Sequence, residues 1–97
     1  MTIKITFSHS SLHDLEEIVD YYKEQKIPHI GKRLISQIII DIELLYDQPE
    51  IGRIVPEFNT KYLRELIRPP FRIVYRCDQK KVSIVRIWRS ERLLALP

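Results

Sequence analysis

The stretch LRELIRPPFRIVYRCDQKKVSIVRIW, residues 63–88, contains three short apolar runs that are threaded with arginine. The runs span residues 63–68, 71–76 and 82–88, and they are separated by Pro69-Pro70 and by the polar residues 78–81. β-Branched and aromatic residues dominate the runs, whereas proline and polar residues mark turns between strands. The stretch therefore predicts three antiparallel strands that are connected as a meander.

The side chains of these strands should fall on two faces, because successive residues of a strand point to opposite sides. A hairpin with Cys77 opposite Val82 decides which residues share a face. One face, which can pack against helices, then carries Phe71, Ile73, Tyr75, Val82, Ile84, Arg86 and Trp88. The other face carries Arg72, Val74, Arg76, Ser83, Val85, Ile87 and Arg89. Its repeated guanidinium groups predict an exposed surface that binds anions.

Charge divides the chain into two unlike halves. Residues 1–52 hold five Lys or Arg against nine Asp or Glu, a net charge of −4, and residues 53–97 hold eleven against four, a net charge of +7. The predicted meander thus lies in the basic half. The excess either protects exposed strand edges from aggregation or forms a surface for nucleic acid or an acidic protein. We favour the binding surface, because so many cations would not usually collect in one half by chance.

The start of the chain predicts a strand followed by a helix. Residues 3–7 alternate apolar and polar side chains, as a half-buried strand does. Ser10 or Ser11 can then cap a helix, with Asp14 three residues beyond Ser11 in a capping-box position. Apolar residues recur at helical spacing from there to Tyr22.

A second helix is predicted from Pro28 to about Asp47, antiparallel to the first, and it is unusually apolar. One stripe of this helix consists of Ile30, Leu34, Ile35, Ile38, Ile42 and Leu45. Ile39 and Ile40 widen the stripe beyond what one buried face requires. The surplus either covers more of the core or forms a groove for a partner chain.

Two other segments have weaker patterns. Residues 47–58 contain prolines at positions 49 and 56 and predict an irregular but ordered connection. Residues 90–96 form a short leucine-rich tail, for which both a final helical turn and an extended docking segment are possible.

Length and composition predict one soluble domain that spans residues 1–97, since 44% of the 97 residues are hydrophobic and 30% are charged. The N-terminus lacks the apolar core of a signal peptide, and no run approaches the ~20 apolar residues of a membrane-spanning helix. We therefore expect a cytoplasmic protein without membrane contact. The single Cys77 cannot form an internal disulfide, and His9 and His13 lack a further ligand at metal-binding spacing. We expect no metal and no cofactor.

Four groups of residues, taken together and in this order, resemble the RelE/ParE superfamily of toxins from type II toxin–antitoxin systems. They are Pro49-x-x-Gly52-Arg53-x-x-Pro56-Glu57, then Leu63-Arg64-Glu65-Leu66, then Phe71-Arg72-Ile73-Val74-Tyr75-Arg76, and finally Val85-Arg86-Ile87-Trp88 with Arg92. The resemblance covers almost the whole chain and is closer to ParE-like members. It implies an α+β fold in which an N-terminal strand and an antiparallel helical hairpin pack on a small antiparallel sheet, in the order β-α-α-β-β-β.

The resemblance also implies a toxin that forms a hetero-oligomer with a cognate antitoxin and, when free, acts on one of two targets. ParE-like members inhibit DNA gyrase, and RelE-like members cleave messenger RNA on the ribosome. A third possibility is an inactive toxin that is retained as an antitoxin-binding partner. The candidates for contact with a target or its phosphates are Arg64, Arg72, Arg76, Arg89 and Arg92. The candidates for antitoxin contact are Ile35, Ile39 and Ile40.

The chemistry of RNA cleavage favours the gyrase target. Cleavage needs a general base, a general acid and cations that stabilise the developing negative charge. Arginine supplies only the cation, because its pKa above about 12 keeps it protonated. The predicted basic face contains no histidine, and Leu66, Ile67 and Glu91 replace basic residues of the ribonuclease pattern. We therefore expect a gyrase inhibitor rather than an enzyme. In the alternative endoribonuclease, the acid or base would come from Lys61, Tyr62, Glu65 or Glu91.

Overall fold

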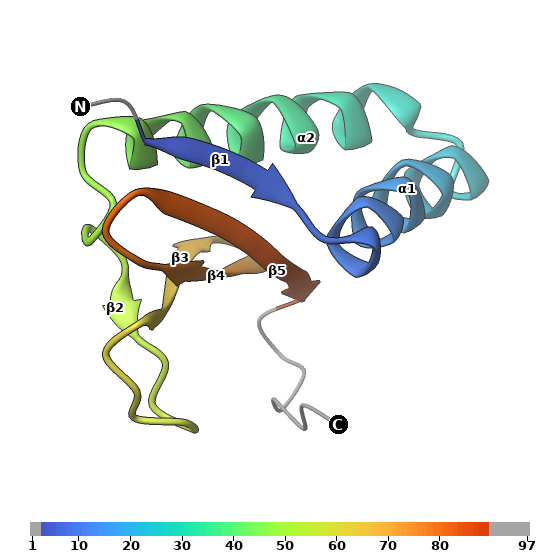
Figure 1. The fold of residues 1–97 in the computed structure, drawn as a ribbon. Helices are drawn as coiled ribbons and strands as arrows, with labels where there is room; N and C mark the ends of the chain where they lie inside the picture. Colours follow the sequence, from blue (N-terminus) through green and yellow to red (C-terminus); the bar gives the residue numbers. More distant parts are fainter. Residues whose placement is uncertain (1–2, 90–97) are drawn as a thin grey trace.

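The computed structural model describes residues 3–89, which form one five-stranded sheet with two helices packed on one of its faces (Figure 1). The elements, in chain order, are β1 (Lys4–Phe7), α1 (His9–Glu24), α2 (Pro28–Glu43), the 3₁₀ helix η1 (Leu44–Tyr46), β2 (Arg53–Ile54), β3 (Leu63–Arg68), β4 (Phe71–Cys77) and β5 (Lys81–Arg89). This arrangement confirms the predicted α+β fold.

The strands lie in the order β1-β5-β4-β3-β2 across the sheet. β3, β4 and β5 form the predicted antiparallel meander, and Cys77 lies opposite Val82 as the hairpin interpretation requires. β1 pairs with β5 in parallel, with Lys4 opposite Lys81, so the sheet is mixed. β2 lies within the segment that was predicted to be irregular, and it pairs antiparallel with the start of β3.

The start of α1 differs from the prediction. The N-cap is Ser8 and not Ser10 or Ser11, because the Ser8 hydroxyl oxygen accepts a hydrogen bond from the Ser11 N–H at 3.0 Å. The same hydroxyl donates to the Val85 carbonyl at 2.8 Å, and the Ser8 N–H donates to the Ile84 carbonyl at 2.9 Å. The pairing of β1 with β5 thus continues into the cap. Tertiary hydrogen bonds select the first of three nearby serines, which sequence spacing alone does not distinguish.

The second helix matches the prediction closely. Pro28 occupies the first turn, where its missing N–H has no partner to lose, and α2 continues through η1 to Tyr46. Each of the two α-helices has 16 residues. Within residues 3–89, neither helix combines the length and the apolar character that crossing a membrane requires.

The main core lies between the helices and the sheet. Its buried residues are Ile18, Ile38, Ile42, Leu45, Phe71, Ile73, Tyr75, Cys77, Val82, Ile84 and Ile87. A second, smaller cluster of Val55, Val74 and Trp88 lies on the sheet face opposite the helices, which we call the open face. The segment between α2 and β3 covers part of the open face and projects below the sheet in Figure 1.

A β-bulge in β5 corrects the predicted division of side chains between the two faces. Val74 lies opposite Arg86, but Tyr75 lies opposite Ile84, so Val85 is an extra residue in β5. The insertion reverses the alternation for the rest of the strand. Arg86 and Trp88 therefore lie on the open face and not on the helix face, whereas Ile87 and Arg89 lie on the helix face and not on the open face.

Candidate functional site

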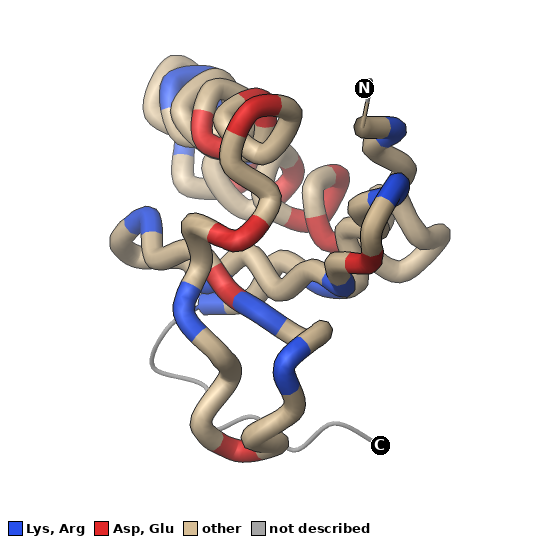
Figure 2. Tube along the Cα trace, turned by 60° about the vertical axis from the view of Figure 1, so that its left-hand side comes forward, with Lys and Arg blue, Asp and Glu red and all other residues tan. Residues whose placement is uncertain are grey.

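The basic residues of the chain lie mainly on the strands and the connecting loops. Figure 2 shows charged residues of both signs on the helices and in the loop that joins β2 to β3, and mainly basic residues on the strands. On the open face, arginine side chains come from three strands: Arg53 from β2, Arg72 from β4 and Arg86 from β5. The partners of these guanidinium groups decide whether the face can bind an anion.

Arg72 is buried rather than exposed, with only 7% of its surface accessible, so the prediction of an exposed Arg72 is wrong. Its Nε donates to a carboxylate oxygen of Glu65 at 2.6 Å. Its Nη1 and Nη2 donate to the two carboxylate oxygens of Glu57 at 3.1 and 3.2 Å. Desolvation by burial acts to lower the pKa of Arg72, but the hydrogen bonds to Glu57 and Glu65 outweigh it and leave the pKa raised. The guanidinium group is therefore a fixed positive charge held between two carboxylates.

Glu65 is the centre of this arrangement, because it also binds a second arginine. Arg53 Nε donates to the other carboxylate oxygen of Glu65 at 2.6 Å, and the Glu65 side chain is fully buried. A buried carboxylate is tolerable only when it is paired and hydrogen-bonded, and here two guanidinium groups supply the pairing. We call Arg53, Glu57, Glu65 and Arg72 the open-face ion cluster. It joins β2, β3, β4 and the loop between β2 and β3.

The segment before β2 is fixed to the sheet by Tyr75 and Arg64. The Tyr75 hydroxyl donates to the Pro49 carbonyl at 2.8 Å and accepts from the Gly52 N–H at 2.9 Å. Arg64 Nη1 donates to the Gly52 carbonyl at 2.9 Å and to the carbonyl of Glu50 at 3.2 Å. Burial raises the pKa of Tyr75, so its hydroxyl remains protonated at neutral pH. Through these contacts, Arg64 holds the segment before β2 against the sheet.

Arg76 lies on an exposed part of β4, where its guanidinium carbon is 4.9 Å from the centre of the Tyr62 ring. This distance allows a cation–π contact and leaves the group accessible to solvent. Arg92 and Glu91 lie outside the described residues. Of the five arginines proposed as target contacts, the structure thus places Arg72 in a buried cluster, Arg64 against a loop and Arg76 at the surface.

A second arginine–carboxylate pair holds α1 against β5. Arg86 Nε and Nη2 donate to the two carboxylate oxygens of Asp14, each at 2.9 Å, and the Ile87 N–H donates to the same carboxylate at 2.8 Å. The pair raises the pKa of Arg86. Asp14 therefore binds the part of β5 that extends beyond β1. The predicted capping-box role of Asp14 is wrong, because the carboxylate is committed to this tertiary contact.

Arg86 also brings the basic residues close to two histidines that the sequence interpretation had set apart. A depression of about 550 Å³ is lined by Arg86 together with His9, Ser10, Leu12, His13 and Glu16. The predicted basic face was expected to contain no histidine, and the structure adds that His9 and His13 lie beside Arg86, an arginine that the prediction had placed on the other face. Only the packing of α1 against β5 creates this proximity, since His9 and Arg86 lie at opposite ends of the chain.

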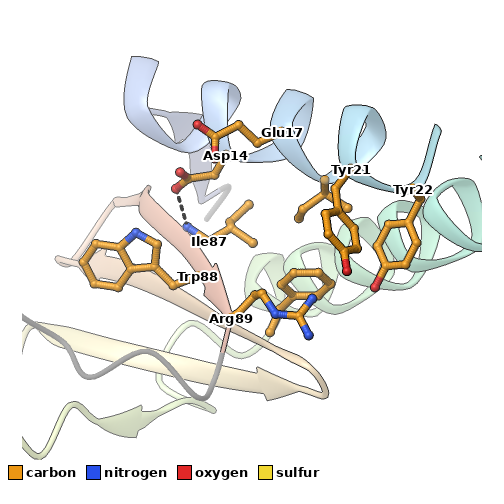
Figure 3. A pocket seen from close by; sticks show the side chains of 9 residues that line it. Asp14, Glu17, Tyr21, Tyr22, Ile87, Trp88 and Arg89 are labelled. Carbon is orange, nitrogen blue, oxygen red and sulfur yellow. Dashed lines mark hydrogen bonds between the residues drawn. The ribbon is translucent and has the colours of Figure 1, made fainter. Parts of the chain in front are cut away.

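Arg89 lines a pocket between α1 and the ends of β4 and β5. The pocket has a volume of about 310 Å³, and its apolar lining includes Ile18, Phe71 and Ile87. Figure 3 shows the Arg89 side chain directed toward the hydroxyl ends of Tyr21 and Tyr22. Asp14 and Glu17 lie nearer the start of α1. The guanidinium carbon lies 5.9 Å from the centres of the Tyr21 and Phe71 rings. The α1 residues of this pocket were not predicted as site residues, because helical spacing presents them as core or solvent positions.

The three isoleucines proposed for antitoxin contact differ in exposure. Ile35 and Ile39 are partly buried against the main core, whereas 58% of the Ile40 surface is exposed. Leu44, one turn further along, is also exposed. An apolar surface pair at the end of α2 is therefore available to a partner.

The described residues contain no group of three His, Cys, Asp or Glu side chains that could hold a metal ion. In the open-face ion cluster, both arginines are permanently charged, and the hydrogen bond from Arg72 lowers the pKa of Glu57. The cluster consists of guanidinium groups and carboxylates and contains no histidine, the side chain that acid–base catalysis most often uses.

Comparison with known proteins shows the family to which the sequence belongs. The family model described as "ParE toxin of type II toxin-antitoxin system, parDE" matches residues 5–94. No curated protein matches the sequence.

Solved structures of toxin–antitoxin systems have a similar fold. The chromosomal ParDE system from P. aeruginosa aligns over 92% of this chain and 97% of that chain, with 24% identity and a TM-score of 0.74. The RelBE2 toxin–antitoxin complex from Mycobacterium tuberculosis covers 92% of this chain and 99% of its own, with 18% identity and a TM-score of 0.61. The DinJ–YafQ toxin–antitoxin complex from E. coli covers 98% and 100%, with 14% identity and a TM-score of 0.56.

Proposed function

The chain belongs to the ParE toxin family of type II toxin–antitoxin systems, and we propose that it inhibits DNA gyrase and is neutralised by a cognate antitoxin. The observation that carries this choice is the composition of the open-face ion cluster. Its members are guanidinium groups and carboxylates, the groups that proteins use for charged contacts with other macromolecules, and they include no histidine to act as general acid or base. Gyrase is a cytoplasmic target, so we place the toxin in the cytoplasm. We also propose that the chain forms a single domain.

The antitoxin is proposed to cover the end of α2. Ile40 and Leu44 expose apolar surface there, and Ile35 and Ile39 lie next to them on the same helix. An amphipathic or extended segment of the antitoxin would bury these side chains when it folds on binding. The similar folds of known toxin–antitoxin complexes support a partner of this kind.

Inducible expression in bacteria, with and without the neighbouring gene, tests both proposals. We expect growth arrest with filamentation and loss of gyrase supercoiling activity in vitro, and we expect coexpression of the antitoxin to restore growth. Normal growth with retained antitoxin binding would indicate an inactive toxin that serves only as a binding partner. Growth arrest with unaffected supercoiling would contradict gyrase as the target.

A ribosome-dependent messenger RNA endoribonuclease is the second candidate function, and the depression beside Arg86 favours it. Histidine is the side chain that most often serves as general acid or base, and here His9 and His13 line the depression together with the cation of Arg86. Primer extension on transcripts after induction separates the two functions. New cleavages inside translated codons that disappear in a His9→Ala/His13→Ala double variant would support the endoribonuclease. Intact transcripts alongside inhibited gyrase would support the proposed function.

A further inference from the structure

The two carboxylates that hold Arg72 are bound in different ways. Glu65 is fully buried, and one of its oxygens lies 2.6 Å from both Nε and Nη2 of Arg72. Glu57 lies in the loop between β2 and β3, 33% of its side chain is exposed, and its contacts with Arg72 are longer, at 3.1 and 3.2 Å. Charged hydrogen bonds are usually shorter than this and weaken with distance. Glu65 is therefore the permanent partner, and Glu57 is the weaker one.

The charges of the open-face ion cluster balance only when Glu57 is in place. Arg53 and Arg72 carry two positive charges, and Glu57 and Glu65 carry two negative charges. When Glu57 turns away, Arg72 keeps Glu65 as its partner, but its Nη1 loses the carboxylate oxygen that accepts its hydrogen bond, at a guanidinium that is almost completely buried. A buried donor without an acceptor is costly, so the cluster then favours an anion that can reach Nη1 of Arg72.

We propose that Nη1 and Nη2 of Arg72 form a carboxylate-binding site whose present occupant is the chain's own Glu57, and that a carboxylate from an acidic peptide segment of a partner protein replaces it. The site already accommodates a planar group with one oxygen for each nitrogen. One negative charge restores the neutral count of the cluster. Only an anion on a slender, flexible side chain reaches a guanidinium at this depth, and an acidic peptide carries such side chains whereas the phosphates of nucleic acid lie on a bulky backbone.

Exchange does not require the loop to unfold. The Phe58 and Asn59 N–H groups donate to the Val55 carbonyl, and these bonds hold the turn while the Glu57 side chain rotates. Val55 itself stays buried in the small cluster with Val74 and Trp88. Phe58, the residue that follows Glu57, is exposed and offers apolar contact to the incoming peptide. This inference concerns recognition of an acidic segment and does not depend on whether gyrase or messenger RNA is the target.

Glu57→Gln tests the site, because the amide keeps the shape of the side chain and removes its charge. The probe is a fluorescently labelled poly-glutamate peptide, titrated by anisotropy at fixed ionic strength so that general charge attraction is constant. Glu50→Gln is the matched control, since Glu50 is also an exposed loop carboxylate and its removal changes the net charge equally. Both positions are at the surface. Urea midpoints of the two variants are to be measured to check that each is folded.

We expect Glu57→Gln to bind the peptide about tenfold more tightly than the parent chain, because removing an internal competitor raises the fraction of open sites. Glu50→Gln should bind like the parent chain, apart from a small effect of net charge. Adding Arg72→Lys to Glu57→Gln should remove the gain, because lysine cannot bind a carboxylate through two parallel bonds. Equal affinities of the Glu57→Gln and Glu50→Gln variants would overturn the proposal. It would also be overturned if a single-stranded oligodeoxynucleotide of similar charge gained affinity and the peptide did not.

Discussion

The two faces of the sheet are stabilised by different physical means. The helix face buries a continuous apolar core that includes Ile38, Ile42 and Ile73. The open face has only three buried apolar residues in its cluster, and it is held mainly by Glu65 between two arginines. Apolar packing is stabilising at any pH and salt concentration, whereas a buried ion cluster depends on every partner being present.

This difference changes the interpretation of the residues that resemble the toxin superfamily. Arg53, Glu57, Glu65 and Arg72 belong to motifs that suggest a charged interaction surface, yet in the folded chain they bind one another. Their first role is to attach the loop between β2 and β3 to the sheet. An anion can use Arg72 only by competing with a carboxylate that is already there.

Glu65→Ala should give the largest effect and would break the open face selectively. It leaves Arg72 buried with one weaker partner and removes the partner of Arg53, so we expect the free energy of unfolding to fall by about 3–5 kcal/mol. Urea denaturation measures this loss, and Ile38→Ala, with an expected loss of about 2–5 kcal/mol, is the comparison from the helix face. A loss below about 1 kcal/mol, as for a surface ion pair, would show that the cluster does not hold the face.

Gly52→Ala should have a smaller effect and sharpens the comparison at the point where the loop meets the sheet. A Cβ at position 52 would lie 2.6 Å from the Tyr75 hydroxyl and 2.7 Å from the Glu65 carbonyl oxygen. We expect a loss of about 1–3 kcal/mol in urea denaturation, because the close neighbours include backbone. Gly31→Ala in α2 is the control, since its Cβ meets Tyr22 at 3.0 Å and alanine gains up to about 1 kcal/mol of helix propensity. Equal losses in the two variants would contradict the proposed close contact.

Glu57→Gln should have the smallest effect on stability. The effect should be visible only in the pH dependence of the free energy of unfolding. The hydrogen bond from Arg72 lowers the pKa of folded Glu57 below 4.5, so this carboxyl binds fewer protons in the folded than in the unfolded chain. Its contribution is present above pH 4.5 and is lost as the pH falls through the lowered folded pKa. Glu57→Gln should therefore lose less stability than the parent chain between about pH 6 and pH 3, by less than about 1 kcal/mol because the pair is partly exposed.

Urea midpoints across this pH range provide the measurement, with Glu50→Gln as the control for a change of one surface charge. If the urea midpoints of the parent chain and of Glu57→Gln changed equally with pH, Glu57 and Arg72 would interact too weakly for Glu57 to occupy the proposed site.

Much of the architecture could be predicted because the signals are local. The alternation in residues 3–7 indicated β1, the helical spacing and Pro28 indicated the two helices, and the turn residues divided the meander into three strands. Two features were not accessible in this way. β1 pairs in parallel with β5, which is far from it in the chain, and the two residues of β2 are defined only by their pairing with β3.

The site was predicted less well than the fold, because its geometry depends on contacts between distant residues. Sequence alternation placed Arg72 correctly on the open face but did not reveal its burial under Glu57. It placed Arg86 and Arg89 on the wrong faces, since a bulge cannot be read from residue types. His9 and His13 looked unconnected to the basic half because only the folded chain brings them to Arg86.

The sequence alone determined the order of the elements other than β2, the apolar stripe of α2 and the concentration of arginine in the meander, since each follows from side-chain chemistry at short spacing. The tertiary structure alone decided which of these arginines face a partner, and whether that partner is a carboxylate, a backbone carbonyl or an aromatic ring. The physical reason is that an extra residue in β5 reverses side-chain direction, and ion pairs such as that of Asp14 with Arg86 join residues 72 positions apart. A local pattern specifies which charges a strand carries, but only long-range packing specifies what neutralises them.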